Sequence, residues 1–215
     1  MFKNYLTKDY GWKKPQTCAH DYLLPTIFNK TKKIELPNNL RILDSGCGGG
    51  HIMNNFFKMG FENIWGFDIA ESGINVARSN FPELGDRLAI HSVYDKNLPN
   101  SLAFKEYDLV LSIEVIEHLY SPETYIKNIR EWLKTGGYVI LTTPYHGYLK
   151  NLAIALTNKF DKHMTVQWEG GHIKFFSKTT LTQLFKECGF SVLEFKGCGR
   201  APYLWKSMLM VAQKK

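Results

Sequence analysis

The chain has 215 residues, of which 44% are hydrophobic and 22% are charged. This length and composition are typical of one globular domain, so we expect a single domain over residues 1–215. The formal net charge is +7, but no run of five like charges occurs. We therefore expect no nucleic-acid partner, while an anionic substrate stays open. With no apolar run long enough for a transmembrane segment, no signal peptide and no C-x-x-C pair, a soluble cytoplasmic protein with reduced thiols is predicted.

Residues 1–39 are predicted to form an N-terminal helical segment. A helix from about Thr17 to Lys33 follows Pro15, and residues 37–39, Pro-Asn-Asn, interrupt the chain before the first strand. We assign ordinary packing to Trp12 and His20 in this segment.

Two strand-turn-helix units follow between residues 41 and 78. The first strand ends in Asp44 and leads into a glycine-rich turn at residues 46–50 and a helix. Glycine allows positive φ angles and lets a ligand lie against the backbone at a helix N-terminus. The second strand ends in Asp68, about twenty residues after the turn, where a carboxylate can accept both hydroxyls of a ribose.

The glycine spacing excludes a nicotinamide dinucleotide fingerprint, because G-x-G-x-x-G would need glycine where His51 or Met53 stands. One acid and three glycines form D-x-G-x-G-x-G instead: Asp44, Gly46, Gly48 and Gly50. This pattern resembles motif I of the class I S-adenosylmethionine-dependent methyltransferases, and Asp68 matches the acid that ends their second strand. The resemblance implies that these residues and Ile69 bind S-adenosylmethionine. In such enzymes the N-terminal segment often lies over the cofactor or substrate.

A helix is predicted over residues 70–80, followed by a third strand over residues 88–94 that leads into Asp95. In the methyltransferases a polar residue near this point meets the adenine amino group, and neighbouring backbone binds the ring. The resemblance thus implies cofactor contacts at Tyr94 and Asp95. A turn-capping role for Asp95 is the alternative.

The run from Tyr107 to Ile113 is almost continuously apolar, as in a strand buried on both faces, and it predicts the fourth strand. A helix over residues 121–134 and a fifth strand over residues 138–143 follow. Residues 145–171 lack clean periodicity but contain several aromatic and histidine residues, which predicts a functional lid. A helix over residues 179–188 and strands over residues 190–195 and 204–212 complete the chain.

This order matches the class I methyltransferase fold over residues 41–211. The resemblance implies an α/β, Rossmann-like, doubly wound seven-stranded sheet, with six parallel strands, one antiparallel strand near an edge and a lid insertion after the fifth strand. Within the class, the sequence EVIEHLYSP at residues 114–122 resembles that of the ubiquinone-biosynthesis O-methyltransferases.

Ligands of open parallel sheets bind beyond the carboxyl ends of the strands, so chemistry is expected just after the fourth strand. Glu114, Glu117 and His118 have i, i+3, i+4 spacing and would share one side of a helical turn. With His172 they would suit a divalent ion such as Mg, Mn or Zn. This arrangement resembles the metal site of small-RNA 2'-O-methyltransferases, and ubiquinone O-methyltransferases have a related site.

Two other interpretations of these residues remain open. In a site without metal, His118 or His172 would take the acceptor's hydroxyl proton as a general base. In a structural interpretation, Glu114 only lies near the adenosine, which would make it a cofactor contact, while Glu117 caps a turn and His118 packs.

The predicted function is S-adenosylmethionine-dependent methyl transfer to a hydroxyl oxygen of a small or medium acceptor, such as a quinol-like phenol or a glycan sugar. Oxygen is preferred because no N-P-P-Y-like motif follows the fourth strand. The alternatives are a metal-dependent RNA 2'-O-methyltransferase and a non-catalytic cofactor-binding protein.

Overall fold

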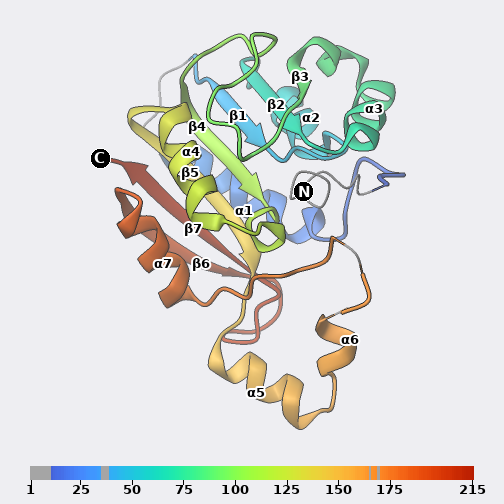
Figure 1. Cartoon of the computed structure of the whole chain (residues 1–215), viewed down its shortest axis with the longest axis vertical. Helices are drawn as coiled ribbons and strands as arrows, with labels where there is room; N and C mark the ends of the chain where they lie inside the picture. Colours follow the sequence, from blue (N-terminus) through green and yellow to red (C-terminus); the bar gives the residue numbers. More distant parts are fainter. Residues whose placement is uncertain (1–10, 35–38, 165, 169) are drawn as a thin grey trace, which may run out of the picture.

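The computed structural model describes residues 11–34, 39–164, 166–168 and 170–215 (Figure 1). Within them a seven-stranded sheet has the order β3-β2-β1-β4-β5-β7-β6. β7 is antiparallel to β5 and β6, and the other neighbouring strands are parallel. The strands are β1 (Ile42–Ser45), β2 (Ile64–Asp68), β3 (Leu88–Ile90), β4 (Tyr107–Ile113), β5 (Leu133–Pro144), β6 (Phe190–Cys198) and β7 (Ser207–Lys214). The expected doubly wound sheet with one antiparallel strand is confirmed.

Helices cover both faces of the sheet (Figure 1). The α-helices are α1 (His20–Lys33), α2 (His51–Lys58), α3 (Glu71–Asn80), α4 (Pro122–Trp132), α5 (Tyr148–Leu156), α6 (Phe160–Met164) and α7 (Lys178–Glu187). Successive side chains of a strand point to opposite faces. Leu109 and Leu111 accordingly pack in the core beneath α1, α2 and α3, whereas Val110 packs in the core beneath α4 and α7. All seven residues of β4 are buried, as its apolar run predicts.

Several predicted strand boundaries are wrong, those of β3 and β5 by the most. β3 ends at Ile90 rather than at Tyr94, so Tyr94 and Asp95 lie in the connection after it, where the Asp95 N–H donates to the carbonyl of Ser92. The helix before β5 ends at Trp132, and β5 begins at once with Leu133, which pairs with Tyr107. The glycine pair at residues 136–137, which we expected to precede the strand, lies inside it beside a register shift.

The segment 145–171, expected to lack regular structure, contains α5 and α6, which extend away from the sheet (Figure 1). The apolar side chains of α5 mostly face outward: Tyr148, Leu149, Leu152 and Leu156 are exposed. Lys150 in the same helix is buried. In most helices the apolar side chains face the core and the charged ones face solvent, and α5 has the opposite arrangement. No helix in the described ranges is long and apolar enough to cross a membrane.

Candidate active site

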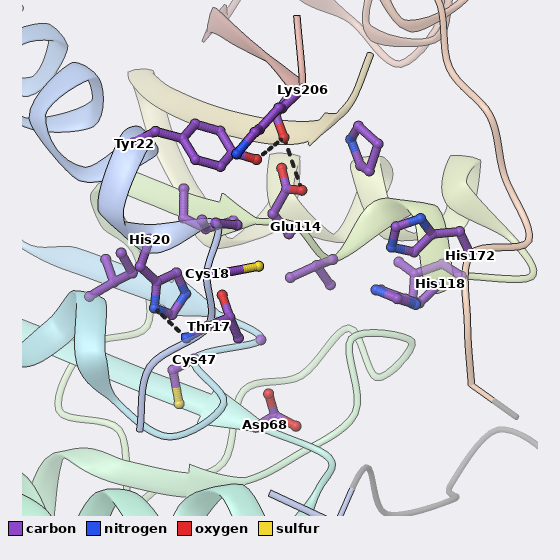
Figure 2. A pocket seen from close by; sticks show the side chains of 18 of the residues that line it. Thr17, Cys18, His20, Tyr22, Cys47, Asp68, Glu114, His118, His172 and Lys206 are labelled. Carbon is purple, nitrogen blue, oxygen red and sulfur yellow. Dashed lines mark hydrogen bonds between the residues drawn. The ribbon is translucent and has the colours of Figure 1, made fainter. Parts of the chain in front are cut away.

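A cavity of about 620 Å³ lies at the carboxyl ends of the central parallel strands (Figure 2). Asp44, Asp68, Ile113 and Pro144, at the ends of β1, β2, β4 and β5, line it. Ser207 also lines it, because β7 runs in the opposite direction and begins at this edge. The volume lies in the range of small-molecule sites, and the position is the one that open α/β sheets use for ligands.

Only the first residues of the glycine turn, which spans residues 46–50, line the cavity. Gly46, with φ +80°, lines the cavity, whereas Gly48 and Gly50 pack against other parts of the protein. A Cβ on Gly48 would lie 2.3 Å from Cζ2 of Trp12, and one on Gly50 would lie 2.8 Å from Cβ of Ala77. Gly48 thus gives Trp12 room to lie over the turn.

Trp12 is held in that place by its own backbone, since its N–H donates to Oγ of Ser72 over 2.9 Å. Trp12 and His20 both line the cavity, although their sequence context favoured ordinary packing. The part of the N-terminal segment that the structure describes therefore forms one wall of the site.

Two carboxylates stand side by side at the glycine-turn end. Asp68 is fixed by backbone donors: Oδ2 accepts the N–H of Gly48 and Oδ1 accepts the N–H of Ala70, each over 2.8 Å. A carboxylate oxygen can accept more than one hydrogen bond. Asp44 is 1% exposed, and its Oδ2 has no hydrogen-bond partner among the described residues. Burial, together with the nearby Asp68, raises the pKa of Asp44 to about 8.

The other residues expected to contact the cofactor, Ile69 after the second strand and Tyr94 and Asp95 after the third, are only partly at the cavity. Ile69 lines it, as do Val93 and Leu119. Tyr94 and Asp95 do not line it, and the Tyr94 hydroxyl instead accepts the backbone N–H of Ser121 over 3.2 Å. The early end of β3 places Val93, one residue before the predicted contact, against the cavity.

Glu114, directly after β4, has a left-handed backbone with φ +56°. Its N–H donates to the carbonyl and to Oγ1 of Thr142, which holds this conformation. Its Oε2 accepts the hydroxyl of Ser207 over 3.1 Å, and Oε1 is buried with no hydrogen-bond partner among the described residues. Burial raises the pKa of Glu114 to about 7. Figure 2 shows Glu114 on the side of Tyr22 and Lys206, apart from His118 and His172.

Glu117, His118 and His172 form a close group, with one ligand atom from each lying within 4.8 Å of the others. Three of the four residues predicted as metal ligands are thus together. Glu114 is outside this group, because the 3-10 turn Ile116–His118 begins two residues after it and does not continue the i, i+3, i+4 pattern back to it.

The imidazole of His118 is oriented by backbone. Its Nδ1 lies 2.8 Å from the carbonyl oxygen of Gly170 and 3.2 Å from that of Gly171. A carbonyl only accepts, so Nδ1 is the protonated nitrogen and Nε2 carries the lone pair. Nε2 lies 3.9 Å from Oε1 of Glu117. Burial lowers the pKa of His118, so this ring is neutral near pH 7.

Glu117 is completely buried and connects three parts of the site. Its Oε2 accepts the hydroxyl of Thr143 over 3.0 Å, and its backbone carbonyl accepts the N–H groups of Ile173 and Lys174. These bonds hold the segment around His172 against the end of β4. Burial, and then the nearby Glu114, raise the pKa of Glu117. Burial, followed by the neighbouring His118, lowers the pKa of His172 to about 4.

Further cavity residues come from segments for which the sequence gave no motif. They belong to the N-terminal segment, to α5 and α6 and to the β6–β7 connection: Thr17, Cys18, Tyr22, Lys150, His163, Arg200 and Lys206. No local pattern could identify them, since only the fold brings these segments to the edge of the sheet.

Comparison with known proteins adds an independent observation. A family model described as "Methyltransferase domain" matches residues 19–194. A ubiquinone biosynthesis O-methyltransferase from a Ruegeria species is 32% identical over 197 residues, which cover 88% of this chain and 77% of that protein.

Solved structures agree on the fold. A putative methyltransferase from Bacillus halodurans superposes with a TM-score of 0.67 at 17% identity, covering 89% of this chain and 98% of that one. The magnesium protoporphyrin IX methyltransferase of Synechocystis, solved with bound SAH, gives a TM-score of 0.61 at 16% identity, covering 90% and 80%.

Proposed function

This chain belongs to the class I S-adenosylmethionine-dependent methyltransferases, and we propose that it methylates a hydroxyl oxygen of a small or medium acceptor, a phenol or a sugar. The observation that carries the proposal is the neutral His118, whose Nε2 lone pair lies beside Glu117 and His172 on the cavity wall. The name of the Ruegeria relative, an O-methyltransferase, also favours oxygen.

S-adenosylmethionine supplies an electrophilic methyl group on its sulfonium when it is bound. We assign its binding to Asp44, Gly46, Asp68 and Ile69, with Val93 on the adenine side. The fit rests on Asp44, because a buried carboxylate oxygen without a partner favours a ligand that brings an ammonium group or another N–H donor. Asp68, at the end of β2, would accept ribose hydroxyls.

The chain's own contribution to the chemistry is removal of the hydroxyl proton. Nε2 of His118 accepts this proton, and the bond from Nδ1 to the carbonyl of Gly170 holds the ring while it becomes charged. Oε1 of the buried Glu117 lies 3.9 Å from Nε2, and Glu117 in its ionised form would stabilise the imidazolium. General-base catalysis of this kind contributes about 10²–10⁴-fold in rate.

As the alternative to this base mechanism, we propose that Glu117, His118 and His172 hold a divalent ion, in which case Nε2 of His118 would be a metal ligand and not the base. Their donor atoms lie within 4.8 Å of one another, and Oε1 of Glu117 is buried with no hydrogen-bond partner among the described residues. One carboxylate and two neutral imidazoles suit a borderline ion such as Zn²⁺ or Mn²⁺. A bound ion would supply a Lewis acid that lowers the pKa of the acceptor's hydroxyl.

The test is a calorimetric titration of S-adenosylmethionine into protein stripped of metal, repeated with Mg²⁺, Mn²⁺ and Zn²⁺. Metal analysis of untreated protein accompanies it, and methyl transfer is measured on a panel of phenols, catechols and sugars. We expect cofactor binding without metal and methylated oxygen in the product. Absence of cofactor binding, or methyl transfer only to nitrogen or carbon, would contradict the proposed function. Metal binding that is unchanged in His172→Ala would contradict the metal site alone.

A further inference from the structure

The cavity has a second end, opposite the glycine turn in the view of Figure 2, where Tyr22, Glu114 and Lys206 lie. Among the described residues, three cationic side chains line the cavity outside the glycine turn: Lys150, Arg200 and Lys206. They come from α5 and from the connection between β6 and β7, two segments far apart in the sequence. The fold therefore brings together three positive charges that no sequence cluster predicts.

Lys150 is the innermost of these cations. It is only 5% exposed, although it belongs to a helix whose apolar side chains mostly face outward. Its Nζ donates to the carbonyl oxygen of Lys206 over 3.2 Å, which leaves two of its three N–H groups available to a ligand. A buried ammonium is costly unless it is both paired and hydrogen-bonded. Lys150 has one hydrogen bond and no ion pair among the described residues, so its position indicates a role in the cavity.

The cations lack a matching set of anions. No described residue forms an ion pair with Lys150, Arg200 or Lys206. Among the described residues, three carboxylates line the cavity, and two of them, Asp44 and Asp68, belong to the glycine-turn end.

The third carboxylate, Glu114, accepts the hydroxyl of Ser207, and burial raises its pKa to about 7, so it is only partly ionised at neutral pH. Burial, and then the nearby Arg200, lower the pKa of Lys150 to about 8, which leaves it largely charged. The net charge at this end of the cavity is therefore positive.

Two of the cations have distinctive local features. The ammonium of Lys206 lies 5.0 Å from the centre of the Tyr22 ring, a cation–π contact that orients it. Arg200 has a left-handed backbone with φ +62°, a conformation that costs free energy for a residue other than glycine and that tends to occur at functional sites.

We propose that the acceptor carries an anionic group, a carboxylate or a phosphate, which Lys150, Arg200 and Lys206 bind while its hydroxyl faces His118. This inference rests on the proposed function, because it specifies the chemistry of the acceptor. Arginine and lysine are the usual partners of both anions, and an arginine can bind either through two parallel hydrogen bonds.

The test measures binding, without methyl transfer, to protein saturated with S-adenosylhomocysteine. The probes are 3,4-dihydroxybenzoate, its neutral counterpart 3,4-dihydroxybenzamide and the phosphate monoester of catechol. We expect at least one anion to bind about tenfold or more tightly than the amide, which is the effect of one or two charge-assisted hydrogen bonds. The comparison of the two anions identifies the preferred group.

Three variants locate the effect: Lys150→Met, Arg200→Gln and Lys206→Met. Each should reduce the preference for the anion, whereas the matched control Lys196→Met, at an exposed lysine of β6 outside the cavity lining, should retain it. The affinity for S-adenosylhomocysteine reports whether each variant is folded. If Lys150→Met does not fold, the two exposed positions decide the test.

The inference is overturned if the amide binds as tightly as both anions, or if the preference survives in every folded variant. This outcome differs from a failure of the proposed function. If the protein binds the cofactor but methylates no hydroxyl oxygen, the proposed function fails, while the anion preference and its loss in the variants can still be measured.

Discussion

Nδ1 of His118 lies 2.8 Å from the carbonyl oxygen of Gly170, and the two residues are 52 positions apart in the chain. The segment after the fifth strand thus determines which nitrogen of a residue after the fourth strand carries the proton. This hydrogen bond gives His118 one defined tautomer, with Nε2 as base or ligand. A shift of the segment around Gly170 would therefore change the chemistry of His118.

Replacing His118 with alanine should remove the proton acceptor and leave the cofactor end unchanged. We expect methyl transfer to fall about 10²–10⁴-fold, while the affinity for S-adenosylmethionine changes less than threefold. Single-turnover rates measure the first quantity and calorimetry the second. A variant that retains more than a tenth of the wild-type rate would rule out the assigned role.

Asp68→Asn tests the cofactor end. The amide nitrogen of asparagine cannot accept an N–H, so at least one of the bonds from Gly48 and Ala70 is lost, together with the negative charge. We expect S-adenosylmethionine to bind about tenfold or more weakly. The control is Asp86→Asn, at an exposed aspartate outside the cavity, which should bind like wild type. Equal affinity of both variants would contradict the assignment.

Two glycine substitutions separate backbone strain from packing. Gly46 and Gly60 both have positive φ, +80° and +91°. A Cβ on Gly46 would lie 2.6 Å from Cγ2 of Val115, whereas one on Gly60 would meet nothing within 4 Å. Gly60→Ala should cost about 1–2 kcal/mol of the free energy of unfolding through strain alone, and Gly46→Ala about 1–3 kcal/mol more. Urea denaturation measures both, and equal losses would show that Val115 moves away without cost.

Acid should destabilise the fold partly through His20. This ring is buried, stacks on His51 at 5.2 Å, and burial followed by His51 lowers its pKa from 6.5 to about 4. A base whose folded-state pKa is lowered contributes stability above its unfolded pKa, and this contribution is lost as the pH falls from about 6.5 towards 4. His20→Gln should therefore lose less stability than wild type between pH 7 and pH 5, measured as urea midpoints. A steeper loss in the variant would mean that His20 does not contribute in this direction.

Local sequence patterns determined the sheet and the glycine-turn end of the site. Apolar runs located the central strands. The acids at the ends of two of them, Asp44 and Asp68, are expected together because parallel strands finish at the same edge. Glu117 and His118 could be predicted as site residues in the same way, because they follow the end of the fourth parallel strand. Boundaries that depend on pairing, such as the early end of β3 and the early start of β5, were not visible.

Only the tertiary structure decided which residues share the cavity. The left-handed backbone of Glu114 separates it from His118, although the two are four positions apart, and the folded segment after β5 brings His172 to Glu117 from a distant part of the chain. Lys150 is buried in a helix whose apolar side chains are mostly exposed. Hydropathy alone would therefore predict that Lys150 faces solvent. The physical reason is that the hydropathy pattern of a helix or strand indicates only which of its side chains pack against the neighbouring core. A cavity, by contrast, is lined by residues from segments whose relative positions depend on long-range packing.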